Sequence, residues 1–214
     1  MRSPRGIPSP LFQRCGLHAL GQSATTLAGI ARRLRAHGTG GSWQTVITPD
    51  LKSFIESQTS IFLATANSAG QPYIQHRGGP AGFLRVLDES TLGFADFAGN
   101  RQYISLGNLS DNPKVHLFLI DYATRNRVKI WGEARVVEDD AELTARLKPK
   151  NYKARAERAI LISVTAWDVN CPQHIPQRLE AKDVAAALAE RDQRIAVLEA
   201  ELTQLRGAAA GRTA

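Results

Sequence analysis

Short apolar segments separated by turn residues occupy most of the chain between residues 60 and 170, and they set the main limit on its fold. The turn signals include Gly70, the run Gly78-Gly79-Pro80 and the polar residues 88–90. Strands are predicted at residues 61–66, 73–77, 83–87, 92–96, 115–120, 128–137 and 160–167. Six or seven antiparallel strands favour a small barrel, because closing the sheet removes its exposed edges. We therefore predict a mainly β fold with peripheral helices, a β-barrel of the α+β class.

Helices are predicted at a few places between and beside these strands. Thr48 and Pro49 are typical of a helix N-cap and first position, and the residues after them place Leu51, Phe54 and Ile55 on one face. A second helix, capped by the aspartate at 139 or 140, should end at Pro149. A further short helical stretch is expected to run up to Arg158.

The segment that follows the strand at 92–96 is a candidate anion site. Gly99 can bring the backbone close to a ligand, and Asn100 is a good N-cap for a helix that should end at residues 112–113. Arg101 would then add a fork-shaped cation in the first turn. A helix N-terminus with an arginine beside it suits a phosphate group. The alternative is an ordinary strand–helix turn with an exposed arginine.

The charge of the 214-residue chain is concentrated at its N-terminus. The net charge is +7, but residues 1–45 hold six arginines and no acid, and the rest has 21 basic and 20 acidic residues. Nucleic-acid binding is therefore poorly supported. We expect residues 1–45 to be a disordered basic extension, either a targeting segment or the result of a start placed too far upstream. The remainder is interpreted as a barrel domain over 46–179, a helix over 180–206 and a disordered tail over 207–214.

Cysteine content and hydropathy suggest where the protein resides. Cys15 and Cys171 lie far apart in the sequence, so no disulfide framework is predicted. No apolar run is long enough to cross a bilayer. A cytoplasmic location is the resulting expectation, since reducing compartments keep thiols free.

The C-terminal helix has a heptad pattern that predicts pairing. Its a positions are Ala181, Leu188, Ile195 and Leu202, and its d positions are Val184, Arg191, Leu198 and Leu205. In a parallel pair, Arg194 would meet Glu199 of the other helix, and Glu201 would meet Arg206. The pattern favours a two-stranded coiled coil. A single amphipathic helix folded back on the barrel is the alternative.

Several segments, taken in order, resemble the pyridoxamine 5′-phosphate oxidase-like FMN-binding split barrels. The likeness covers residues 48–178 and rests on segments 73–79, 94–102, 108–115, 132–134 and 170–175. It implies a six-stranded antiparallel split barrel plus a C-terminal helix, a homodimer, and FMN held at the subunit interface.

The resemblance also implies a set of cofactor-binding residues. Arg101 matches the arginine that binds the FMN phosphate, Gln102 stands where the family usually has a lysine, and Arg127 replaces a glutamine near the flavin ring. The predicted cofactor-binding residues are Gln75, His76, Arg77, Gly78, Gly79, Asn100, Arg101, Gln102, Ser105, Asn108, Arg127 and Trp167. No catalytic residue and no metal ligand is predicted.

Some of these residues have simpler interpretations, which stay open at this point. His76 could be an exposed or satisfied strand histidine, and Trp167 could serve burial alone. Ser105 and Asn108 could cap or pack their helix.

The function implied by the resemblance is that of an FMN-dependent oxidoreductase with an unknown substrate. The arginine- and histidine-bearing substrate segment of true pyridoxamine-phosphate oxidases is not found, so vitamin B6 oxidation is not predicted. A split barrel that uses a deazaflavin or haem is one alternative, with His76, His116 and His174 as the histidines of the domain. The other alternative is a non-enzymatic flavin sensor or interaction module.

Overall fold

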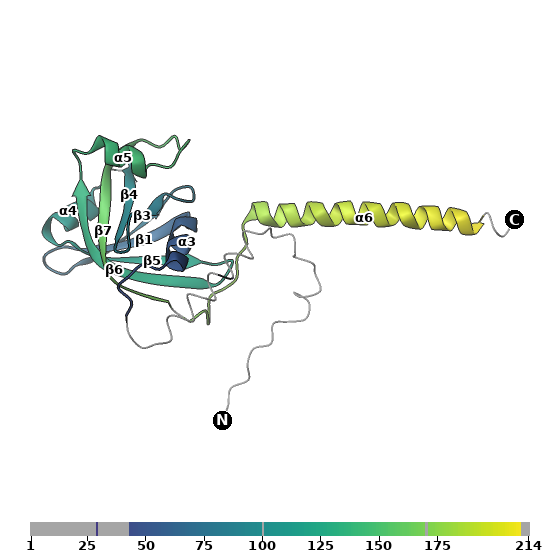
Figure 1. Cartoon of the computed structure of the whole chain (residues 1–214), viewed down its shortest axis with the longest axis horizontal. Coiled ribbons are helices and arrows are strands. Elements are labelled where there is room, and N and C mark those ends of the chain that lie inside the picture. The colour runs from purple at the N-terminus through teal and green to yellow at the C-terminus, as the bar shows by residue number, and fades with distance from the viewer. Residues whose placement is uncertain (1–28, 30–42, 100, 170, 211–214) are drawn as a thin grey trace, which may run out of the picture. The chain divides into compact units, whose positions relative to one another are not determined.

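Seven antiparallel strands form one curled sheet in the computed structural model, which describes residue 29 and residues 43–99, 101–169 and 171–210 (Figure 1). The strands are β1 (Ser60–Ala66), β2 (Pro72–Gly78), β3 (Leu84–Val86), β4 (Thr91–Phe97), β5 (Lys114–Asp121), β6 (Asn126–Val137) and β7 (Ala156–Val169). Their order in the sheet is β2-β1-β5-β6-β7-β4-β3. The sheet curls into a half-barrel, which confirms the predicted fold class. All seven predicted strands are present, including the short β3 paired with β4, one more than the six that the family resemblance implies.

Three helices lie beside this sheet: α3 (Pro49–Ser57), α4 (Ile104–Asp111) and α5 (Ala141–Leu147). The α3 helix begins as predicted, with the Thr48 hydroxyl oxygen accepting a hydrogen bond from the Leu51 N–H at 3.2 Å. The Asp140 carboxylate caps α5 in the same way, accepting from the Leu143 N–H at 2.7 Å. Both caps satisfy backbone donors that the first helical turn leaves unpaired.

The prediction of a short helical stretch up to Arg158 is wrong. Strand β7 already begins at Ala156, and Arg158 pairs with Asp96 of β4 in the ladder. Alanine and arginine favour helices locally, but Ala156 and Arg158 pair with Phe97 and Asp96 of β4 as the start of a long strand. Tertiary pairing therefore overrides the local propensity.

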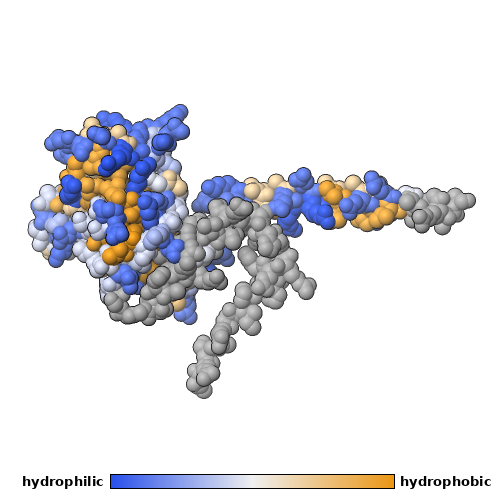
Figure 2. Space-filling model, viewed as in Figure 1, coloured by the Kyte–Doolittle hydropathy of each residue, from blue (hydrophilic) through white to orange (hydrophobic). Residues whose placement is uncertain are grey.

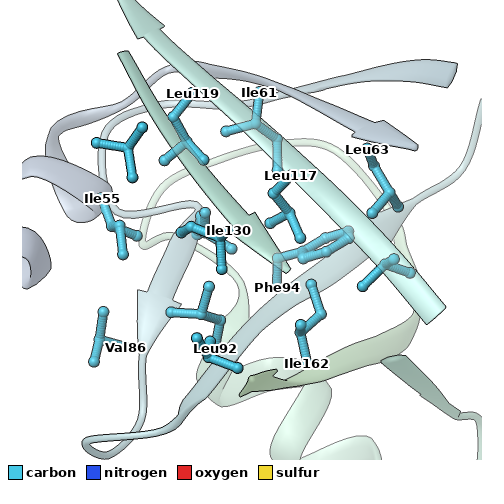
Figure 3. Packing of buried hydrophobic residues seen from close by; sticks show 14 of the residues in the cluster. Ile55, Ile61, Leu63, Val86, Leu92, Phe94, Leu117, Leu119, Ile130 and Ile162 are labelled. Atoms are coloured by element: carbon cyan, nitrogen blue, oxygen red, sulfur yellow. The ribbon is translucent and has the colours of Figure 1, made fainter. Parts of the chain in front are cut away.

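The main core fills the inside of the curled sheet (Figure 3). Alternate residues of each strand point inward, so that Ile61 and Leu63 of β1 are fully buried while the residues between them are not. Phe94 of β4, Ile130 of β6 and Ile162 of β7 meet them from other strands. The α3 helix adds its own buried face, Leu51, Phe54 and Ile55.

A smaller core lies on the other face of β4 and β7, beneath α5. It contains Ala95, Leu147, Ala159 and Leu161. Strand β4 is therefore buried on both of its faces, in agreement with its nearly continuous apolar sequence.

Gly132 of β6 lies opposite a bulge in β7. The register of β6 against β7 shifts between Trp131 and Gly132. A Cβ atom at residue 132 would lie 2.4 Å from the backbone oxygen of Ser163, closer than atoms can approach. Only glycine permits the two strands to approach this closely.

Residues 43–46 lie along the sheet before α3 begins. Gln44 pairs with Trp167 of β7, and the Trp43 ring packs against that of Trp131 with the ring centroids 4.3 Å apart and the planes tilted by 57°. The Trp167 indole N–H donates to the carbonyl oxygen of Val46 at 2.9 Å. These contacts attach the start of the described segment to β6 and β7.

The sheet and its three helices belong to one compact unit, residues 27–177, and α6 (Ala181–Ala210) belongs to another. This helix is four residues longer than the predicted 206 end, and Figure 1 draws it as one continuous helix. Among the described residues, no helix is both long and apolar enough to span a membrane.

Candidate functional site

A small polar hollow opens between β2, the end of β4 and the start of α4. Its volume is about 40 Å³. It is lined by Gln75, Arg77, Asp96, Phe97, Gly99, Arg101, Gln102, Tyr103, Ser105, Leu106 and Glu157. Five of the twelve predicted site residues are thus brought together, from segments far apart in the sequence: Gln75, Arg77, Arg101, Gln102 and Ser105.

A buried ionic cluster forms the floor of the polar hollow. Arg77 of β2 is ion-paired with Asp96 of β4, and Arg158 Nε lies 3.7 Å from the other oxygen of the same carboxylate. Arg158 is also paired with Glu138 and with Glu157. Asp96 is only 7% exposed and therefore depends on these two arginines to remain charged.

The protonation of Asp96 reflects a balance between burial and its partners. Burial raises the pKa of the Asp96 carboxyl above its ordinary value, because the charged form loses its hydration. Arg77 and Arg158 act in the opposite direction and offset this effect only in part.

The turn between β4 and α4 has an unusual backbone. Arg101 has a φ of 56° and Tyr103 a φ of 52°, both in the left-handed region that non-glycine residues seldom occupy. Tyr103 is the N-cap of α4, which begins at Ile104. The prediction that Asn100 caps this helix and that Arg101 lies in its first turn is therefore wrong, because two left-handed residues delay the helix. Asn100 itself lies outside the described residues.

Arg101 is exposed at the rim of the polar hollow. It forms no ion pair with any residue that the structure describes. The neighbouring Gln102 is also exposed at this rim. The polar hollow therefore has buried arginines that are neutralised by carboxylates at its floor, and a cation available to an anion at its rim.

Ser105 and Asn108 attach α4 to the sheet. The Ser105 hydroxyl donates to the Gln75 side-chain oxygen at 2.8 Å, and both residues line the polar hollow. The Asn108 amide donates to the Thr65 hydroxyl at 2.9 Å and is buried outside it. The packing interpretation therefore describes Asn108, whereas Ser105 both packs and lines the site.

His76 and the two glycines after Arg77 do not line the polar hollow. His76 points to the opposite face of β2, where its Nε2 lies 2.7 Å from the Ser60 hydroxyl. A Cβ atom on Gly79 would lie 2.7 Å from the Phe83 Cβ, so packing within the chain explains this glycine. Gly78 is the last residue of β2, with the His76 ring beside it.

Arg127 and Trp167 also lie outside the polar hollow. Arg127 is near the start of β6, and its buried Nε has no hydrogen-bond partner among the described residues. Trp167 is 1% exposed within the main core. The structural interpretation of this tryptophan therefore fits its position.

The sequence predictions missed Asp96, Tyr103 and Glu157 as lining residues. Asp96 carried a detectable signal, since it is in phase with the buried Leu92 and Phe94 of the same strand. A carboxylate on a core-facing position requires a partner, and Arg77 supplies it. No sequence pattern marked Tyr103 or Glu157.

Comparisons with known proteins place the chain in a family. The sequence model described as pyridoxamine 5′-phosphate oxidase matches residues 47–205. No curated protein matches the chain. HupZ from Group A Streptococcus is 20% identical, with a TM-score of 0.48 over 62% of this chain and 99% of that one.

Two further solved structures are similar at lower scores. An FMN-binding protein from Syntrophomonas wolfei subsp. wolfei is 12% identical, with a TM-score of 0.44 over 76% of this chain and 98% of that one. The haem-storage protein HutZ from Vibrio cholerae is 17% identical, with a TM-score of 0.37 over 56% of this chain and 89% of that one. The match to the family model covers most of the chain: it belongs to the pyridoxamine 5′-phosphate oxidase family.

Proposed function

We propose that the chain binds FMN, with the phosphate group at the polar hollow, and that it acts as an FMN-dependent oxidoreductase. The main support is the position of Arg101, an exposed guanidinium at the rim that no described carboxylate neutralises. A guanidinium can bind phosphate oxygens through two parallel hydrogen bonds. Membership in the pyridoxamine 5′-phosphate oxidase family makes FMN the first cofactor to test.

The dimensions of the polar hollow fit one part of FMN. Pockets that enclose a whole ligand of this size usually measure about 300–1,000 Å³, whereas the hollow holds about 40 Å³. It has room for a phosphate group and not for the flavin ring. The ring would therefore lie outside the hollow.

The chain's own residues would divide the work of binding between them. Arg101 would hold the phosphate charge, and Gln102 would offer a neutral amide donor where a lysine would add a second charge. The Ser105–Gln75 hydrogen bond fixes one wall of the site. Asp96 holds Arg77 in place and keeps the floor from becoming strongly cationic. Bound FMN would supply the redox chemistry, while the protein contributes orientation and electrostatics.

Arg127 would act on the flavin ring rather than on the phosphate. Its guanidinium lies outside the polar hollow. Its buried Nε–H has no hydrogen-bond partner among the described residues. An arginine near the pyrimidine end of the ring would stabilise negative charge on the reduced flavin.

We also propose a homodimer formed through the barrel. Directly opposed residues of β1, β2 and β5 share a face that points away from the core. This outer sheet face consists of Phe62, Ala64, Ile74, His76, His116 and Phe118. Ile74 is 61% exposed, and a second copy of the same face would bury it.

FMN binding is tested by absorption and by titration. Purified protein should be yellow, and mass spectrometry should identify FMN among the molecules released on denaturation. Arg101→Ala should weaken binding about 10- to 150-fold, the equivalent of about 1.5–3 kcal/mol for a charge-assisted contact. Arg146→Ala, which removes an exposed arginine from α5, is the control for charge and should leave affinity unchanged. Protein that never binds FMN would overturn the proposal, and an unchanged dissociation constant would exclude Arg101.

Turnover is a separate question with its own outcomes. If the enzyme proposal is right, bound flavin should be reduced by NAD(P)H and reoxidised repeatedly by an acceptor such as oxygen. Flavin that binds without turnover would instead favour a sensor. Binding of haem or a deazaflavin in place of FMN would instead identify the chain as a haem- or deazaflavin-binding split barrel.

The proposed dimer is tested by truncation after Glu180. The truncated protein should remain a dimer, and Ile74→Glu should convert it to a monomer in light scattering.

A further inference from the structure

The α6 helix carries a long apolar stripe that the described chain leaves exposed. Its large apolar side chains at heptad a and d positions are between 39% and 67% exposed: Val184, Leu188, Ile195, Leu198, Leu202 and Leu205. Figure 2 shows apolar side chains along this helix among hydrophilic ones. A helix of 30 residues is about 45 Å long. Such a stripe is stable in water when another surface of similar length covers it.

The spacing of this stripe matches a two-stranded coiled coil. Six of the eight a and d positions between residues 181 and 205 hold large apolar residues, and Ala181 and Arg191 occupy the other two. This is the heptad repeat of about 3.5 residues per turn that keeps a seam on one side of each helix. Val197, the remaining exposed valine of α6, lies off the seam.

We propose that α6 pairs in parallel and in register with α6 of a second copy of this chain. The charged residues beside the seam form opposite-charge pairs only between two copies of α6. Arg194 at a g position faces Glu199 at the e position of the partner, and Glu201 faces Arg206 in the same way. Residues five apart are not neighbours on one helix, so these pairs have no equivalent within a single α6. The partner surface is therefore a second α6.

Cysteine cross-linking tests both the contact and its direction. The full chain would carry Cys15→Ser and Cys171→Ser, and Val184→Cys or Leu205→Cys would be oxidised with diamide, which accepts the two thiol hydrogens as the disulfide forms. The two sites are about 30 Å apart along the helix. In a parallel pair in register, each variant should form a disulfide dimer with itself.

Matched controls lie one residue away from each site. Asp183→Cys and Gln204→Cys are turned by about 100° around the helix and point away from the seam. They should cross-link far more slowly, which separates seam contact from mere proximity within a dimer. Equal rates at seam and control positions would overturn the proposal. So would a lack of cross-links at both seam sites with helix content retained, the result expected of a helix folded back on its own domain. Cross-links only in a mixture of the two seam variants would show an antiparallel pair and also overturn it.

Charge reversal provides a second, independent test. Arg194→Glu and Glu199→Arg should each slow cross-linking at Leu205→Cys, because each places like charges across the seam. The double variant Arg194→Glu with Glu199→Arg should restore the rate, since the pair is rebuilt with its signs exchanged. Failure of the double variant to recover would contradict the g–e pairing. Neither test involves FMN, so the coil and the cofactor proposals succeed or fail separately.

Discussion

Arg77 and Asp96 form an ion pair between two strands that are not neighbours in the sheet. Strand β2 is one edge of the sheet, and β4 lies beside the opposite edge strand. The ion pair therefore joins the two sides of the split in the half-barrel, at the floor of the polar hollow. Its side chains are only 16% and 7% exposed, so that each charge relies on the other.

Breaking this pair from one side should destabilise the domain. Asp96→Asn leaves the buried Arg77 without its carboxylate, and the free energy of unfolding should fall by about 3 kcal/mol, the lower end for a broken buried pair. The lower end is expected because burial already raises the pKa of Asp96 and offsets part of the attraction. Arg77→Met combined with Asp96→Leu should recover much of the loss. Urea denaturation measures all three, and a single variant as stable as wild type would contradict this account.

Arg101→Gly should weaken FMN binding without lowering the stability of the folded domain. A left-handed conformation costs a non-glycine residue about 1–2 kcal/mol, and glycine removes that strain at the price of a more flexible unfolded chain. The variant should therefore unfold at no lower denaturant concentration than wild type, while FMN binding weakens about 10- to 150-fold. Arg125→Gly is the matched control, with a φ of 55° and an exposed side chain away from the polar hollow. It should show the same stability without the loss of affinity.

His116 should make the domain less stable in mild acid. Burial, together with the nearby Lys129, lowers the pKa of His116 below its ordinary value of 6.5. The unfolded chain then binds a proton more readily than the folded one, so stability present above pH 6.5 is lost as the pH falls below it. Denaturation at about pH 7.5 and about pH 5.5 should show a smaller loss for His116→Gln than for wild type. Equal losses would exclude His116 as a source of the pH dependence.

Two glycines should respond to alanine in opposite directions. Gly132→Ala places a Cβ atom 2.4 Å from a backbone oxygen of β7, so the strands must separate. We expect a loss of about 1–3 kcal/mol in the free energy of unfolding. Gly107 lies within α4 with open space where a Cβ would be. Gly107→Ala should stabilise by about 0.5–1 kcal/mol, because alanine favours the helix. Thermal denaturation of the pair checks both, and a destabilised Gly107→Ala would refute the packing of α4.

Local signals were sufficient to predict most of the strands and two helix starts. Thr48 and Asp140 cap helices through hydrogen bonds to residues three positions later, an interaction that a sequence pattern records directly. Alternation in β1 likewise reflects one buried face, as at Ile61 and Leu63. These features depend on neighbours in sequence, which is why they could be predicted.

The polar hollow depends on partners that are distant in sequence. Arg77 and Asp96 are 19 residues apart, and Ser105 contacts Gln75 across 30 residues. The left-handed backbone at Arg101 and Tyr103 replaces the expected N-cap, and no residue type there announces it. The sequence indicated that an arginine lies near this turn. It could not show which carboxylates hold the arginines around it.

The contacts of residues 43–46 determine how short this domain can be made. A chain that starts at residue 46 would lose the Trp43 ring from the face of Trp131 and the backbone pairing of Gln44 with Trp167. The truncation would expose the Trp131 ring. It would also weaken the attachment of Val46, whose carbonyl oxygen accepts a hydrogen bond from the Trp167 indole. The smallest domain that keeps these contacts therefore begins at Trp43, and deletion experiments on the basic extension should stop before it.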